Sequence, residues 1–154
     1  AAMLSDLGVA LAGQDLRAAR LCLEVAAGAG ETGAMNNLGN VLVRLDPPEI
    51  AEARSLWEKA AAAGNADAMA NLGDLFSQSD PPDPTAARAW LDKAVAAGHP
   101  GAMTSMAKAL LRSDPQNVSA AMDWLQKAAA AGEPRAKSLM DGLSDLQHGR
   151  DAEK

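Results

Sequence analysis

One pattern of small, apolar and polar positions recurs along the chain at a fixed interval. In its clearest copy an Ala60-Ala61 pair precedes Gly64, Ala68 follows, and Leu72-Gly73 completes the pattern. The glycines of the four copies are Gly30, Gly64, Gly98 and Gly132, so each step (64−30, 98−64, 132−98) is 34 residues. A constant period of this length is typical of stacked helical repeats, in which neighbouring repeats bury each other's apolar faces.

Within each period the apolar residues predict two helices. Ala34, Leu38 and Leu42 recur every four positions, which is the spacing of one helix face. A second stripe contains Ala53, Trp57 and Ala60. The helices predicted in this way, which we call helix A and helix B of each repeat, cover 34–44 and 49–62, 68–78 and 84–96, and 102–112 and 118–130.

Turn residues separate these helices. Asp46-Pro47 ends the first helix of its repeat because proline lacks a backbone N–H, and Asp80-Pro81 and Asp114-Pro115 hold the same place in later repeats. Asp83 and Asn117 are predicted to cap the helices that follow, and Gly64 is predicted to end a helix in the left-handed conformation. We expect no metal site at the three aspartates, because no further oxygen ligands accompany them.

The last repeat position is occupied by a single helix, predicted over 134–147 and followed by a polar tail, 148–154. Lys137 and Asp141 stand where earlier repeats have methionine and a small residue. Terminal repeats need a polar outer face, so this helix is predicted to be a C-terminal cap.

The first repeat shows no such polar change. It spans only 22 residues from Gly8 to Gly30, against 25 from Gly39 to Gly64, and Met3 and Leu7 stay apolar. We therefore expect another segment or another chain to cover this end.

Composition and charge exclude several classes of partner. The chain is 48% hydrophobic but only 3% aromatic, so much of its apolar content is alanine. Its net charge is −6 and it has no run of Lys or Arg, which argues against nucleic acid and anionic membrane surfaces. No apolar stretch is long enough for a membrane span, so we expect no membrane insertion.

The single cysteine, Cys22, permits no intrachain disulfide. With no signal-peptide pattern, this favours a cytoplasmic location. Because the chain begins with Ala1-Ala2 and not with Met, we expect it to be part of a longer protein.

These residues resemble the Sel-one-like branch of the tetratricopeptide-repeat superfamily. The superfamily's helix-B pattern of Ala, aromatic and Ala appears as Ala53-Trp57-Ala60, and its helix-A pattern appears as Asn37-Leu38-Gly39 and Asn71-Leu72-Gly73. Leucine replaces the aromatic in Ala19-Leu23-Ala26, Ala87-Leu91-Ala94 and Ala121-Leu125-Ala128. The Ala-Ala-x-x-Gly-x-x-x-Ala link with a lengthened loop distinguishes this branch, and the resemblance covers residues 3–146.

The resemblance implies an all-α fold, namely a right-handed α-solenoid of about four antiparallel helix pairs plus the capping helix. The repeat domain would cover 1–147, with repeats at about 3–33, 34–67, 68–101 and 102–135. The first helix of each pair, helix A, would line a concave groove that binds a protein or peptide.

The positions that match the family's groove are mostly polar. Asparagine suits this task because its amide offers both a donor and an acceptor for the backbone of an extended peptide. Arg44, Lys108 and Arg112 would add positive charge for an acidic ligand end. The alternative is that all these are ordinary solvated positions. The candidate partner-binding residues are Asn36, Asn37, Asn40, Arg44, Asn71, Asp74, Gln78, Thr104, Lys108 and Arg112.

Catalytic signatures are absent from the sequence. His99 and His148 have no neighbours at metal-ligand spacing, and Cys22 falls in a helix packing position that predicts a buried, inert thiol. Trp57 is predicted to lie in the core, and partial exposure is expected for Trp90 or Trp124. We expect no enzyme activity, no cofactor and no metal.

The sequence thus favours a monomeric protein-interaction module. One alternative is a structural or assembly domain that docks through its N-terminal end or its convex face. Another is a regulatory domain attached to an enzyme outside these residues.

Overall fold

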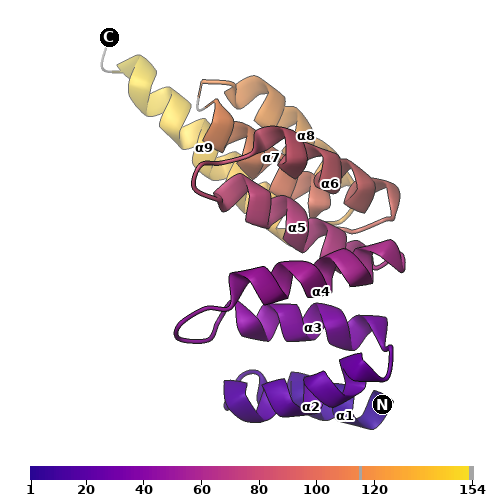
Figure 1. The fold of residues 1–154 in the computed structure, drawn as a ribbon. Helices are drawn as coiled ribbons and strands as arrows, with labels where there is room; N and C mark the ends of the chain where they lie inside the picture. The colour runs from indigo at the N-terminus through magenta and orange to yellow at the C-terminus, as the bar shows by residue number, and fades with distance from the viewer. Residues whose placement is uncertain (115, 153–154) are drawn as a thin grey trace. The chain divides into compact units, whose positions relative to one another are not determined.

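The protein is described by a computed structural model that covers the backbone of residues 1–114 and 116–152 and the side chains of 1–114 and 116–145. Every regular element within these residues is a helix, as Figure 1 shows. The chain divides into two compact units, residues 1–72 and 73–154, with the boundary inside α5. The helices are α1 (Ala2–Leu11), α2 (Leu16–Gly28), α3 (Thr32–Leu42), α4 (Ile50–Ala62), α5 (Ala66–Gln78), α6 (Pro84–Ala96), α7 (Ala102–Ser113), α8 (Val118–Ala130) and α9 (Pro134–Ala152).

The predicted helices are present, with small differences at their ends. The second helix of each pair was placed correctly, and α6 and α8 have the predicted bounds. The first helix starts earlier than predicted in α3 and α5. In α5 the reason is local, because Asn65 Oδ1 accepts a hydrogen bond from the N–H of Ala68 at 2.8 Å. The last helix continues to Ala152, so most of the predicted tail is helical, and residues 153–154 lie outside the described part.

In the unit of residues 1–72, α1 packs on α2, α2 on α3 and α3 on α4, in chain order (Figure 1). Its contacts depend on a glycine of one helix facing a large side chain of its pair partner. A Cβ on Gly8 would lie 2.6 Å from Leu23 Cγ, and one on Gly39 would lie 2.8 Å from Trp57 Cε2. Leu23 and Trp57 are buried as predicted, since the missing Cβ lets the two backbones approach closely.

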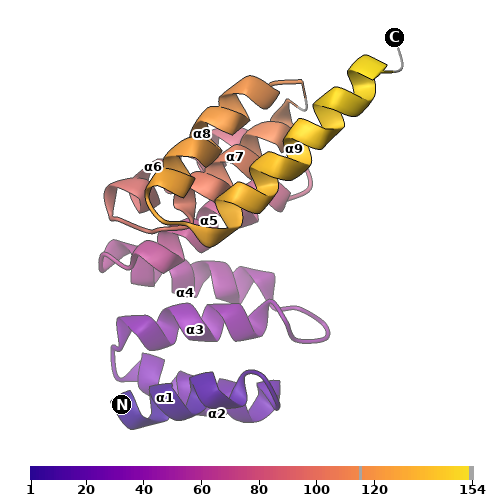
Figure 2. The same cartoon turned by 180° about the vertical axis from the view of Figure 1, so that it is seen from behind.

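The unit of residues 73–154 repeats this arrangement. A Cβ on Gly73 would meet Leu91 Cγ at 2.5 Å. Farther along, Leu125 packs in a cluster with Ala107 and Ala136, and α9 lies against α8 (Figure 2). Lys137 and Asp141 of α9 are exposed, which agrees with the predicted polar outer face.

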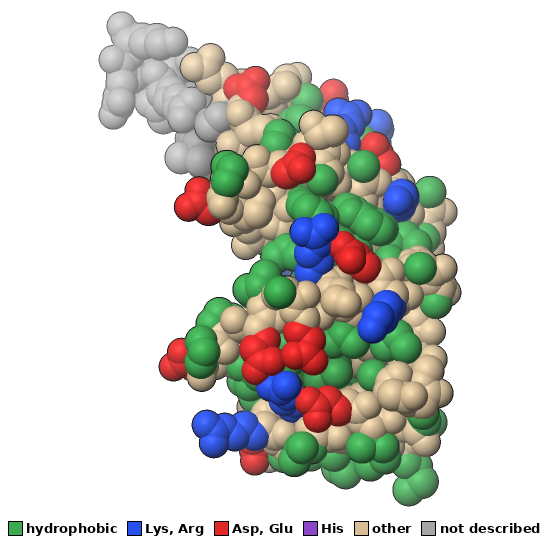
Figure 3. Space-filling view, viewed as in Figure 1, with side chains coloured by type: hydrophobic (Ala, Val, Ile, Leu, Met, Phe, Trp, Pro, Cys, Tyr) green, Lys and Arg blue, Asp and Glu red, His purple; other side chains and the backbone are tan. Residues whose placement is uncertain are grey.

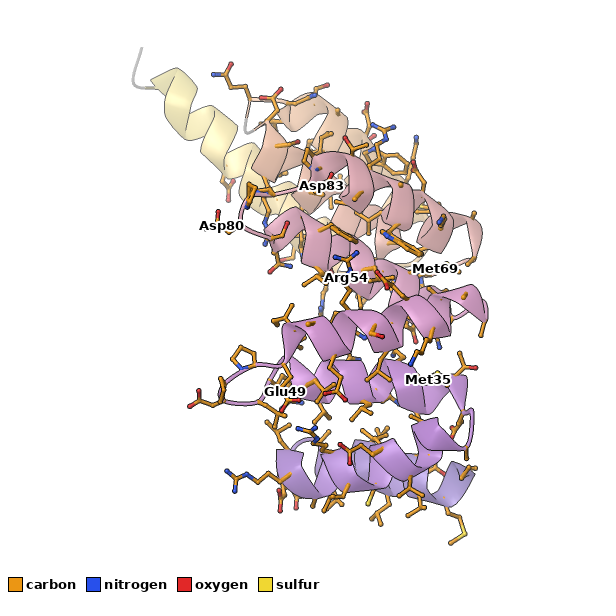
Figure 4. All side chains as sticks on the ribbon, in the orientation of Figure 1. Met35, Glu49, Arg54, Met69, Asp80 and Asp83 are labelled. Atoms are coloured by element: carbon orange, nitrogen blue, oxygen red, sulfur yellow. The ribbon has the colours of Figure 1, made fainter. Side chains whose placement is uncertain are left out.

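The turn residues act as the sequence predicts. Gly30, Gly64, Gly98 and Gly132 all have positive φ, between 81° and 87°. Asp83 accepts a hydrogen bond from the N–H of Ala86 at 2.9 Å and so caps α6. Asp80, in the preceding loop, points away from the helices (Figure 4). The Asp46-Pro47 and Asp80-Pro81 peptide bonds are cis. Pro115, in the third of these Asp-Pro sequences, lies outside the described residues.

Arg20 joins α2 to α4 in the first unit. Its guanidinium bonds Glu24 Oε1 and Glu49 Oε1, each at 2.6 Å, and lies 3.8 Å from Glu52 Oε2. Figure 4 shows Glu49 at the start of α4. The hydrogen bond from Arg20 lowers the pKa of Glu49. The pKa of Glu52 is raised, first by the burial of its carboxyl group and then by the neighbouring Glu49 carboxyl. Three carboxylates therefore share one cation.

Gly39→Ala should lower the free energy of unfolding by about 1–3 kcal/mol, because the new methyl group overpacks the contact with Trp57. Gly142→Ala is the matched control, since a Cβ there meets nothing within 4 Å. It should raise stability by up to about 1 kcal/mol through helix propensity. Urea unfolding followed by circular dichroism measures both. Equal effects of the two substitutions would contradict the close glycine contact.

Arg20→Gln should lower the melting temperature at neutral pH, because it leaves three carboxylates without their cation. Since the folded-state pKa of Glu49 is lowered, its contribution is present above its ordinary pKa of 4.5 and is lost as the pH falls through the lowered value. As the pH falls, Glu52, whose pKa is raised, also takes up a proton, which reduces the repulsion between the carboxylates that Arg20 no longer neutralises. The difference between variant and parent should therefore shrink on acidification.

Arg88→Gln is the control for this experiment, because the ion pair of Arg88 is made with Asp92 on the same exposed helix, at 3.7 Å, and does not join two helices. Its melting temperature should stay near that of the parent at every pH. A pH-independent loss in Arg20→Gln would show that packing of its aliphatic stem, not its charge, stabilises this contact.

Candidate functional site

An amide cluster lies on the helix-A side of the first unit. Asn71, from α5, donates through Nδ2 to Oδ1 of Asn36 and Oδ1 of Asn40, both 2.9 Å away. Asn36 Nδ2 in turn lies 3.4 Å from Asn37 Oδ1. Three of the four asparagines come from α3, where their spacing places them on one side of the helix. The structure therefore brings together the four predicted asparagines as one hydrogen-bonded group.

Trp57 of α4 bonds the backbone of α3 that carries this cluster. Its indole Nε1 donates to the backbone carbonyl of Asn36 at 3.2 Å. Because Gly39 has no side chain, the indole ring lies directly against α3. Trp57 thus holds the backbone segment that carries the amides, a role that sequence reasoning missed. The available signal was that only this repeat has an aromatic residue where Leu23, Leu91 and Leu125 stand in the others.

The asparagines differ in their access to a partner. Asn36 is only 4% exposed, so it acts inside the cluster and does not face a partner. Asn37, Asn40 and Asn71 are half-buried, and Arg44 is exposed one helical turn after Asn40. The predicted groove position of Asn36 is therefore reassigned to a supporting role, since its amide is used to orient Asn71.

The hydrogen bonds within the cluster leave amide groups of Asn71 and Asn40 available to a partner. Both Nδ2 protons of Asn71 are used internally, which leaves its Oδ1 as an acceptor. Asn40 uses its Oδ1, which leaves its Nδ2 as a donor. If the amide groups were all flipped, Asn71 would present the donor and Asn40 the acceptor. Either assignment offers one donor and one acceptor side by side.

The second unit carries a more charged helix-A face on α7 and the C-terminal half of α5. Ser105 Oγ donates to Asp74 Oδ2 at 3.2 Å, and Arg112 Nη1 donates to Ser77 Oγ at 3.1 Å. Ser77 is buried and its own hydroxyl donates to the carbonyl of Asp74. Arg112 is thereby oriented by a buried partner.

The remaining candidates in this unit divide by exposure. Thr104 is 4% exposed, so it is a packing residue and not a contact residue. Lys108 and Gln78 are exposed, and Lys108 lies one turn before Arg112 on α7. Lys108 and Arg112 therefore form a basic pair on a chain that is acidic as a whole.

A separate pocket of about 270 Å³ opens in the second unit between the start of α6 and α7. Met106, Ala109 and Leu110 line it, with Arg88 beside them. Its volume falls below the usual range of about 300–1,000 Å³ for small-molecule sites. It contains none of the predicted partner-binding residues.

The residues considered for catalysis do not come together. Cys22 is half-buried, which corrects the expectation of a fully buried thiol. His99 lies in the link before α7, and the side chain of His148 lies outside the described residues. Among the described residues no group of three or more His, Cys, Asp or Glu side chains is arranged to hold a metal ion.

Trp90 and Trp124 are both partly exposed, whereas the sequence led us to expect this of one. Lys93 Nζ lies 4.0 Å from the ring centre of Trp90, and Lys127 Nζ lies 4.6 Å from that of Trp124. The lysines cover the rings by a cation–π contact, which makes each pair part of the ordinary helix surface. In the described part of the chain, no helix has both the length and the apolar character needed to cross a bilayer.

The family model described as "Sel1 repeat" matches residues 32–65, 66–99 and 100–133. No curated protein matches the chain significantly.

Three solved structures share the fold. A Sel1 repeat protein from Oxalobacter formigenes aligns with a TM-score of 0.73 and 21% identity over 96% of this chain and 65% of its own. Protein c5321, described as a protective antigen of uropathogenic Escherichia coli with an SLR fold, aligns with a TM-score of 0.68 and 25% identity over 82% of this chain and 28% of its own. A sel1 repeat protein from Klebsiella pneumoniae subsp. pneumoniae gives 0.64 and 22%, over 93% and 76%. The chain thus spans less than two thirds of the first two proteins, and its architecture is an α-helical repeat solenoid.

Asn71→Ala should lower the free energy of unfolding by about 1–3 kcal/mol, because it leaves the buried Oδ1 of Asn36 without a donor. Asn37→Ala is the control, since Asn37 makes only the long 3.4 Å contact and its loss should cost much less. Chemical unfolding curves measure both. Equal stabilities of the two variants would show that Asn71 does not hold the cluster together.

Proposed function

Because the chain belongs to the Sel1 repeat family, we propose that it is a protein-interaction module that binds an extended segment of a protein or peptide on its helix-A faces. Sel1 repeats are generally protein–protein interaction modules, which supports the class of function. The proposal adds which face is used and which side chains make the contacts.

The amide cluster of the first unit is the observation that carries this proposal. Asn40 and Asn71 offer one donor and one acceptor side by side, whichever way the amides are oriented. A peptide unit in an extended segment offers the complementary acceptor and donor, its C=O and its N–H. Recognition of this kind reads the backbone and tolerates many side chains, so it suits a module that binds segments of varied sequence.

Preorganisation supports the same proposal. Asn71 is held by hydrogen bonds to Asn36 and Asn40, and the indole of Trp57 holds the backbone carbonyl of Asn36. The side chains of Asn40 and Asn71 therefore need little further ordering when a partner arrives. Binding to fixed side chains avoids an entropic cost of about 0.5–1.5 kcal/mol for each side chain that would otherwise be immobilised.

The α7 face of the second unit adds a preference for acidic segments. Arg112 is exposed and uses one of its five N–H donors on Ser77, and Lys108, one turn earlier on α7, is exposed too. A carboxylate of the partner would find charge-assisted hydrogen bonds there. We therefore propose that bound segments are acidic or carry an acidic end.

The chain's own residues supply no reaction in this proposal. Any catalysis would belong to residues outside this chain, for which the repeats would act as a regulatory or assembly domain. We further propose a cytoplasmic location, which the single cysteine favours.

A peptide array covering acidic and neutral extended sequences tests the proposal. Asn40→Ala should weaken binding about tenfold or more, because it removes one half of the donor–acceptor pair. Gln126→Ala, on the exposed side of α8, is the control and should bind as the parent does. Asn40 rather than Asn71 is chosen because Asn71 also stabilises the cluster.

Arg112→Ala separates the two parts of the proposal. It should weaken binding of acidic peptides and leave neutral ones unchanged. Binding that survives substitution of Asn40, Asn71 and Arg112 in folded variants would place the working surface on another face. An array without any bound peptide would contradict the proposed function.

A further inference from the structure

The pocket of the second unit lies between the first turn of α6 and the C-terminal half of α7, two helices that pack on each other (Figures 1 and 2). We call it the α6–α7 pocket. Part of its lining is apolar, since Met106 is 2% exposed and Ala109 and Leu110 are partly buried. The polar side chains of the lining are Thr85, Arg88 and Ser113.

The corresponding positions of the first unit, on α3, are covered. Two steps of 34 residues before Ala109 and Leu110 stand Val41 and Leu42, which are 1% and 0% exposed. On α5, one step before Ala109, the position is held by Leu75. Alanine is smaller than either of these side chains, so α7 leaves space beside α6 at a position where the other helices carry a larger residue.

Arg88 lacks the carboxylates that the arginine at its repeat position meets in the first unit. Arg20, two steps earlier, contacts two glutamates of α4. The counterparts of those glutamates on α8 are uncharged, namely Asn117 and Ala120. The ion pair of Arg88 with Asp92 is long, at 3.7 Å, and the Arg88 side chain is 62% exposed. An exposed pair of this kind contributes little, so Arg88 can exchange Asp92 for the carboxylate of a partner.

The chemistry of the lining restricts the occupant. Figure 3 shows Lys and Arg side chains interspersed with Asp and Glu side chains on the visible face of the molecule. On such a surface an anion is recognised by an individual cation and not by a broad positive field. The volume of about 270 Å³ lies below the range usual for small-molecule sites and suits one large side chain. The matching group therefore combines an apolar side chain with a nearby negative charge.

We propose that the α6–α7 pocket binds the C-terminal residue of a partner protein, with its apolar side chain in the pocket and its terminal carboxylate on Arg88. A C-terminal residue carries both groups on one Cα. In an extended internal segment, neighbouring side chains point to opposite faces, so an acidic neighbour would point away from the pocket.

Two side chains of the lining can hold such a residue. The guanidinium of Arg88 offers a planar fork of N–H donors that matches a carboxylate. Ser113 Oγ donates to the carbonyl of Leu110 at 2.9 Å, which leaves its lone pairs to accept the N–H of the bound residue. Both side chains belong to helices of the same unit, so the site is complete within residues 73–154.

This inference goes beyond the proposed binding of extended segments. The α6–α7 pocket contains none of the asparagines of the amide cluster and neither Lys108 nor Arg112. The helix-A faces would bind the interior of a segment, whereas this pocket would bind the end of a chain. The two sites can therefore be tested separately.

Fluorescence anisotropy with peptides labelled at their N-termini tests the proposal. The peptides end in leucine or phenylalanine and carry no other charged residue. The parent should bind them when the terminal carboxylate is free, and amidation of that carboxylate should raise the dissociation constant about tenfold or more. A peptide that ends in serine should also bind more weakly, because it leaves the apolar lining uncovered.

Two variants locate the binding. Ala109→Leu places in the pocket the side chain that α5 has at this position, and it should raise the dissociation constant about tenfold or more. Ala130→Leu, at an exposed position of α8, is the control for the added volume. Arg88→Gln should bind free and amidated peptides equally. Arg17→Gln removes an exposed cation from α2 and should preserve the difference between them. Thermal unfolding checks that all the variants fold.

Three outcomes would overturn the proposal. One is a parent that binds no such peptide up to millimolar concentration, and another is a parent that binds free and amidated peptides equally. The third is an Ala109→Leu variant that binds as the parent does, which would place the site elsewhere. Asn40→Ala should leave this binding unchanged. Array peptides attached through their C-terminal ends have no free carboxylate, so the array tests the helix-A faces independently.

Discussion

The contact between a glycine of one helix and a large side chain of its pair partner determines the packing of the first three helix pairs, and Ala107 takes the place of the glycine in the fourth. At Gly8 and Gly39 the backbone of helix A lies so close to Leu23 and Trp57 that a methyl group would not fit. A chain with 3% aromatic residues and much alanine can bury little area per side chain. It compensates by bringing helices together closely, so that many small contacts add up. The exposed polar faces depend on this packing because it sets where each helix face points.

This close packing also explains why the polar residues of helix A behave differently from one another. Asn36 points into the structure and is fixed by Asn71, whereas Asn40 keeps a free amide donor or acceptor. In the second unit Thr104 takes the buried position that Asn36 has in the first, and Lys108 and Arg112 take the outer ones. A repeat therefore uses one polar position for structure and others for recognition, although all of them look alike in the sequence.

The burial of apolar residues on the first helix of a pair depends on which helix packs against it. Ala34 and Leu38 of α3 are buried because α2 packs against them. Met3 and Leu7, at the corresponding positions of α1, are exposed in this structure, as are Leu21 and Val25 of α2. In contrast, the last helix exposes Lys137 and Asp141.

The sequence by itself determined the all-α fold, the repeat family and the bounds of α3 to α8 to within two residues. The reason is that helix periodicity, proline stops and capping residues such as Asp83 act over a few neighbouring residues. Trp57 was placed in the core for the same reason. Only the tertiary structure decided which asparagines face outward, that Trp57 bonds the carbonyl of Asn36, and that Cys22 is only half-buried. Those outcomes depend on contacts between residues 20 to 35 positions apart, such as Asn36 with Asn71, which no local pattern encodes.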